Sequence, residues 1–136
     1  MAEKYLELYK QFLNYIHTDN YEKLYEMMDP NFHLEIKGVP AFAGSYNLQK
    51  FKDFNKKLHA ALQGGWKAKL HELLIEEKKA AAHFQHEFTY NGKRLAFDGI
   101  LFLELNREGT KILKMESILS APLEFFAFAE ALKKAA

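Results

Sequence analysis

The fold is decided by residues 80–106, which read AAAHFQHEFTYNGKRLAFDGILFLELN. Apolar and polar residues alternate on both sides of the Asn91-Gly92 dipeptide, and a period of two is typical of half-buried strands. An Asn-Gly pair between two such runs predicts a two-residue hairpin turn. The stretch therefore predicts two long antiparallel strands, 80–90 and 94–106.

The alternation continues outside this hairpin, with further strands expected at 66–76 and 111–120 and a short one at 32–37. Before residue 62, apolar residues recur at helical spacing and predict three helices. Breaks are expected at Asp29-Pro30-Asn31, in a loop at 43–45 and at Gly64-Gly65, and a short helix at 123–134 follows Pro122. This order predicts an α+β fold, a cone-shaped curved antiparallel sheet packed against three N-terminal helices, with a short C-terminal helix.

Bulk composition narrows the possible partners. The net charge is +1 with both signs interleaved, and the third helix carries its lysines on a solvated face. We therefore expect no nucleic-acid or membrane partner. Cysteine is absent, which excludes disulfides and thiolate chemistry. With no signal-peptide pattern and no apolar run near the ~20 residues of a membrane span, we expect a cytoplasmic protein. The regular Lys/Glu/Leu/Ala surface fits a natural or an engineered origin.

Three segments carry a resemblance to a known superfamily. Residues 28–35 are similar to its helix-to-strand junction, 43–51 to the loop before its third helix, and 98–112 to its last hairpin. Together with the element order, they resemble the nuclear transport factor 2-like superfamily, in its SnoaL-like and ketosteroid isomerase-like branches. The resemblance implies one SnoaL-like domain over 1–136, with a core at about 5–120 and a helical tail at 122–136. It also implies a pocket in the cone and a homodimer formed through the outer face of the sheet.

The same resemblance implies that this chain lacks the ketosteroid isomerase mechanism. The positions of its general base, its oxyanion tyrosine and its second oxyanion acid correspond to Ile36, Phe12 and Leu101. None of these side chains can donate a hydrogen bond or exchange a proton. The scaffold hosts isomerases, dehydratases, hydrolases and binding proteins, so fold alone does not assign the function.

Side chains alternate between the two faces of a strand, and the resemblance implies which face is turned toward the pocket. Together they predict an apolar pocket wall with two polar residues in it, His86 and Ser117. The expected ligand-binding residues are Phe12, Tyr15, Ile36, Phe51, Phe84, Phe88, Phe97, Leu101, Leu103, Met115 and Leu119.

The candidate catalytic residues are His86, Glu35 and Ser117. Loss of hydration among phenylalanines favours a neutral imidazole at His86, which can accept a proton from a substrate; the alternative is a hydrogen-bonded core histidine. Glu35 becomes a second acid or base if a bulge turns it into the cavity, and is otherwise a solvated edge residue.

Other polar residues are assigned structural roles. Asp98 faces away from Leu101, where pairing with Lys67 or Lys69 is expected. His83 and His86 are three apart on a strand and lie on opposite faces, so no metal site is expected. Three phenylalanines of the tail are expected to cover the pocket mouth or to pack in a subunit interface: Phe125, Phe126 and Phe128.

The favoured hypothesis is a protein that binds a small apolar molecule, cyclic or polyketide-like, with cofactor-free proton transfer as its possible chemistry. The alternatives are a non-catalytic binder of hydrophobic ligands and a dimerising interaction domain. No cofactor is expected in any of these.

Overall fold

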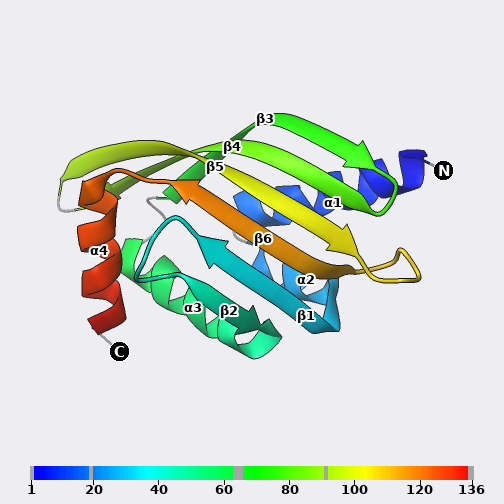
Figure 1. Cartoon of the computed structure of the whole chain (residues 1–136), viewed down its shortest axis with the longest axis horizontal. Helices are drawn as coiled ribbons and strands as arrows, with labels where there is room; N and C mark the ends of the chain where they lie inside the picture. The colour runs from blue at the N-terminus through cyan, green and yellow to red at the C-terminus, as the bar shows by residue number, and fades with distance from the viewer. Residues whose placement is uncertain (1, 19, 63–65, 91, 135–136) are drawn as a thin grey trace.

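A computed structural model describes residues 2–18, 20–62, 66–90 and 92–134. Its helices are α1 (Ala2–His17), α2 (Tyr21–Glu26), α3 (Leu48–Leu62) and α4 (Leu123–Lys134). Its strands are β1 (Met28–Lys37), β2 (Gly44–Asn47), β3 (Trp66–Glu76), β4 (Lys79–Tyr90), β5 (Lys93–Leu105) and β6 (Ile112–Ser120). The described strands form one curved, open sheet, which confirms the predicted α+β class (Figure 1).

The sheet has the strand order β2-β1-β6-β5-β4-β3. Strands β3, β4, β5 and β6 are antiparallel neighbours, as predicted. Strand β1 runs parallel to β6, so the sheet is mixed rather than antiparallel throughout. This pairing joins two segments far apart in the chain, and no local turn signal in the sequence reports it.

The first strand begins earlier than the sequence predicts. Asp29-Pro30-Asn31 lies inside β1, where the register against β6 shifts between Met28 and His33. Pro30 has no N–H for the strand ladder, and the Asn31 N–H donates to Oδ1 of Asp29 at 2.8 Å. The expected break is therefore a local irregularity in a continuous strand. Residues 44–47, which begin in the predicted loop, form β2, a short edge strand antiparallel to β1.

The central hairpin forms as predicted. Tyr90 pairs with Lys93 across the turn, and Gly92 has a φ of +76°, a left-handed conformation that glycine adopts without strain. Asn91 lies outside the described residues, as do Gly64 and Gly65, which were expected to end the third helix.

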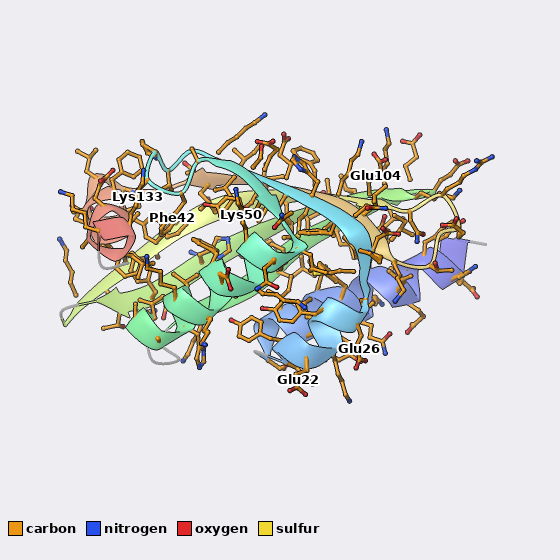
Figure 2. All side chains as sticks on the ribbon, turned by 90° about the horizontal axis from the view of Figure 1, so that it is seen from below. Glu22, Glu26, Phe42, Lys50, Glu104 and Lys133 are labelled. Carbon is orange, nitrogen blue, oxygen red and sulfur yellow. The ribbon has the colours of Figure 1, made fainter. Side chains whose placement is uncertain are left out.

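Helices α1, α2 and α3 lie on one side of the sheet (Figure 1). Burial alternates along β5, with Phe97 and Leu101 buried and Asp98 and Ile100 exposed. Seen from below, Glu22 and Glu26 of α2 point away from the sheet (Figure 2). The covered face is therefore apolar and the other face is open to solvent.

A buried tyrosine attaches α1 to the sheet. The Tyr9 hydroxyl donates to the backbone carbonyl of Lys78 at 2.7 Å, in the turn between β3 and β4. Burial raises the pKa of the Tyr9 phenol, so this hydroxyl keeps its proton and remains a donor.

Helix α4 closes one end of the covered face, beside the β4–β5 hairpin (Figure 1). The Phe125 side chain is fully buried, with its ring centroid 4.7 Å from that of Phe97 and 5.0 Å from that of Phe88. Phe128 is also buried, and Phe126 is partly buried against the same core. These rings fill the core of this chain, in place of the expected pocket mouth or subunit interface.

Among the described segments, no helix combines the length and the apolar character that crossing a membrane requires.

Candidate functional site

A cavity of about 190 Å³ lies between the helices and the covered face of the sheet. Its lining residues are Ile16, Tyr21, Leu24, Leu34, Ile36, Phe42, Phe51, Phe54, Asn55, Leu58, His59, Leu62, Ala68, His86, Leu101, Met115, Ser117 and Leu119. A smaller recess of about 60 Å³ shares several of these residues and adds Phe84, Gly99 and Ile100. Apolar walls with a few polar groups are typical of small-molecule sites.

About half of the residues predicted to bind a ligand line the cavity or the recess. Ile36, Phe51, Leu101, Met115 and Leu119 line the cavity, and Phe84 lines the smaller recess.

The other predicted wall residues do not line the cavity or the smaller recess: Phe12, Tyr15, Phe88, Phe97 and Leu103. Four of them are buried in the core, and Tyr15 is partly buried against it. Phe88 and Phe97 point inward as expected, but Phe125 and Phe128 occupy the space in front of them. The helix that follows the last strand therefore removes that end of the concave face from the site.

His86 lies on the sheet wall of the cavity, half-buried between aromatic rings. Its ring centroid is 6.0 Å from that of Phe84 and 5.3 Å from that of Phe97. A methyl group placed at Gly99 would lie 2.8 Å from Nε2 of His86 and 3.2 Å from a methyl carbon of Leu119. The ring therefore fits closely over the β5 backbone because residue 99 has no side chain.

Ser117 supplies a hydroxyl on the same wall. It is half-buried on β6, pairs with Leu101 of β5 and lines both the cavity and the smaller recess, as His86 does. The structure therefore brings together two of the three predicted catalytic residues. An imidazole can accept or donate a proton, and a hydroxyl can donate or accept a hydrogen bond to a ligand.

Glu35 lies on the other face of the sheet, away from His86. Its neighbour Ile36 points into the cavity, whereas the Glu35 carboxylate accepts hydrogen bonds from the Ser45 hydroxyl and, at 2.9 Å, from Nε2 of His33. These hydrogen bonds lower the pKa of the Glu35 carboxyl. The bulge in β1 ends before His33 and does not turn Glu35 inward, so this residue does not join the cavity.

A cluster on the outer face also differs from expectation. Oδ1 of Asp98 lies 3.7 Å from Nε2 of His83, in place of the expected partners Lys67 and Lys69. The His71 and His83 rings have centroids 5.2 Å apart. No group of three or more His, Asp or Glu side chains is arranged to hold a metal ion in the described part of the chain.

Three polar lining residues were missed by the sequence reasoning: Tyr21, Asn55 and His59. Asn55 follows Phe51 by four residues and precedes Leu58 by three, so it lies on the inward stripe of α3. A polar residue on an apolar stripe was the signal that could have identified it. His59 is exposed, and its ring meets that of Tyr21 edge-on at 6.1 Å, so this pair marks the mouth of the cavity.

Comparisons with known proteins give structural likeness only. No family model and no curated protein matches the sequence. Bal32a, from a soil-derived mobile gene cassette, has a TM-score of 0.78 at 17% identity, with 95% of this chain and 96% of Bal32a covered. BvnE pinacolase from Penicillium brevicompactum has a TM-score of 0.78 at 13% identity, with 99% of this chain and 96% of BvnE covered. TerC, co-crystallised with polyporic acid, has a TM-score of 0.76 at 17% identity, with 93% of this chain and 98% of TerC covered. Identities this low show a shared fold.

The close approach of His86 to Gly99 predicts a coupled mutational effect. Gly99→Ala should destabilise the protein by about 1–3 kcal/mol, since the ring is held between Phe84 and Phe97 and cannot move freely. Removing the ring by His86→Ala should relieve most of that penalty, so the two changes should be strongly non-additive. Urea unfolding of the two single variants and the double variant measures the coupling. Additive losses would show that His86 does not lie over Gly99.

Proposed function

We propose that this chain, which has the fold of the nuclear transport factor 2-like superfamily, binds a small, largely apolar molecule in the cavity between α3 and the sheet. The observation that carries the proposal is the composition of the cavity wall. Apolar side chains form most of it, and His86 and Ser117 interrupt it from the sheet side. Burial of apolar ligand surface supplies the affinity, and the two polar groups orient the ligand.

The chemistry that fits this wall is proton transfer without a cofactor. The His86 imidazole accepts a proton from a ligand carbon or hydroxyl and returns it at another position, while the Ser117 hydroxyl hydrogen-bonds to the ligand oxygen that gains charge. The ketosteroid isomerase mechanism does not apply, because Ile36 and Leu101 place apolar groups on the wall. Likeness to BvnE, a pinacolase, and to TerC, crystallised with polyporic acid, supports a role with small molecules.

A non-catalytic binding protein is the second candidate. The observation that favours it is the small number of polar groups: 18 residues line the main cavity, and His86 and Ser117 are its polar groups on the sheet side. An apolar cavity binds apolar ligands without chemistry.

Native mass spectrometry of protein taken directly from cells tests the cavity. Wild-type protein should carry a discrete adduct that is lost on denaturation. Ala68→Phe should abolish the adduct, because Ala68 lines both the cavity and the recess and a phenyl ring would fill that space. The matched control is Ala96→Phe, the same change on the exposed face of β5, which should retain the adduct. Wild-type protein without any adduct, after incubation with a panel of ring compounds, would contradict the proposal.

The two candidates separate when the recovered ligand is incubated with the protein in D₂O. Catalysis predicts deuterium incorporation or a changed mass in wild type, reduced about 100-fold or more in His86→Gln. A ligand recovered unchanged and free of deuterium would contradict catalysis and support the non-catalytic binding protein.

We also propose a homodimer through the outer face of the sheet. Three exposed apolar residues border one hollow on this face: Leu74 at 61% exposure, Ile100 at 42% and Ile118 at 37%. Ile100 and Ile118 are directly paired across β5 and β6. Lys37 forms an ion pair with Glu116 on this face. Charges of both signs therefore lie on it, and a second copy can meet it without net repulsion.

The dimer proposal predicts the mass in solution. The 15.9 kDa chain should elute as a dimer in size-exclusion chromatography with light scattering. The double change Ile100→Lys and Ile118→Lys should give monomers, because it buries two unpaired charges in the interface. Leu123→Lys, at an exposed apolar residue on α4, is the control and should remain dimeric. A wild-type monomer at high micromolar concentration would refute the dimer.

A further inference from the structure

Asn55 is a buried polar side chain on the helix wall of the cavity. It lies on α3, is 8% exposed and lines the cavity between apolar neighbours. His86 and Ser117 lie on the sheet, so the cavity has polar groups on two opposing walls. A buried amide is costly unless its donors and acceptors are used.

The hydrogen bonds of Asn55 leave one end of its amide available. Nδ2 donates to the Tyr25 hydroxyl oxygen at 3.2 Å. The carbonyl oxygen, Oδ1, accepts no hydrogen bond from the described residues. Burial raises the pKa of the Tyr25 phenol and the hydrogen bond from Asn55 opposes the rise, so Tyr25 is neutral at pH 7 and its bond holds the amide in place. The free acceptor is thus fixed in an apolar wall.

The cavity volume limits the size of the ligand. At about 190 Å³ it is comparable to an apolar cavity of about 150 Å³ that holds benzene. It is smaller than the ~300–1,000 Å³ typical of sites for drug-sized ligands. The enclosed space therefore fits one or two rings.

We propose that the ligand is a one- or two-ring molecule with a hydroxyl or N–H group at one end, which donates to Oδ1 of Asn55, and a carbonyl at the other end, which accepts from Ser117 beside His86. This inference rests on the proposed function and deepens it, since it names the chemical class of ligand. Asn55 selects for the donor: a ligand of the same shape without it leaves the amide oxygen unpaired.

The test uses a matched pair of compounds. 4-Hydroxyacetophenone has a hydroxyl and a carbonyl at opposite ends of one ring, and 4-methylacetophenone replaces the hydroxyl with a methyl group of similar size. Isothermal titration of wild-type protein should show that the hydroxyl compound binds about fivefold or more tightly, the usual effect of one buried hydrogen bond. Asn55→Leu, which keeps the side-chain volume and removes the acceptor, should abolish that preference. The control is Asn14→Leu, the same change at an exposed position of α1 outside the cavity, which should preserve that preference.

A measurement on wild-type protein makes the test independent of the variants' folding. The side-chain amide resonances of Asn55 should shift on addition of the hydroxyl compound and much less with the methyl compound. Equal affinities, or a preference that survives in Asn55→Leu, would overturn this inference and leave the proposed function intact. If neither compound binds at millimolar concentration, the result contradicts both the proposed binding of ring compounds in this cavity and the ligand class inferred from Asn55.

Discussion

The contact between α4 and the concave face of the sheet determines where the cavity lies. Phe125 packs against Phe88 and Phe97 and meets Phe42 from the loop after β1, at a centroid distance of 5.9 Å. Figure 2 shows Phe42 between α3 and α4. A curved sheet covered by helices encloses more space than its own side chains fill, and these rings fill one end of it. The cavity lies in the remaining space, under α2 and α3.

Small side chains on the sheet keep that space open. Ala68 pairs with His86, Gly99 with Phe84, and Ser117 with Leu101, so each small residue has a larger neighbour on the adjacent strand. The same arrangement holds His86 against the β5 backbone at Gly99. Polar groups on the cavity wall are few: His86 and Ser117 lie on the sheet, Asn55 and His59 on α3, and Tyr21 on α2.

Local patterns predicted much of this structure. The alternation in the sequence located strands β3 to β6 to within about a residue, and the same parity placed His86 inward and Asp98 outward. Packing between distant segments was not predictable in the same way. The parallel β1–β6 pair and the insertion of Phe125 in front of Phe97 depend on tertiary contacts that leave no local periodicity. The outward position of Glu35, by contrast, follows the alternation of β1 and matches the alternative of a solvated edge residue. Asn55 is an intermediate case, because its place on an apolar helix stripe was visible in the sequence but its neighbours were not.

The central claim, an open apolar cavity beside His86, is tested most directly by methyl NMR under xenon pressure, because xenon enters apolar cavities. Met115 lines the cavity, whereas Met28 is buried in the core outside it, so the two methyl groups form an internal comparison. We predict that the Met115 methyl resonance shifts with xenon pressure while that of Met28 stays nearly constant. An unchanged Met115 resonance would show that the protein's own side chains fill this space.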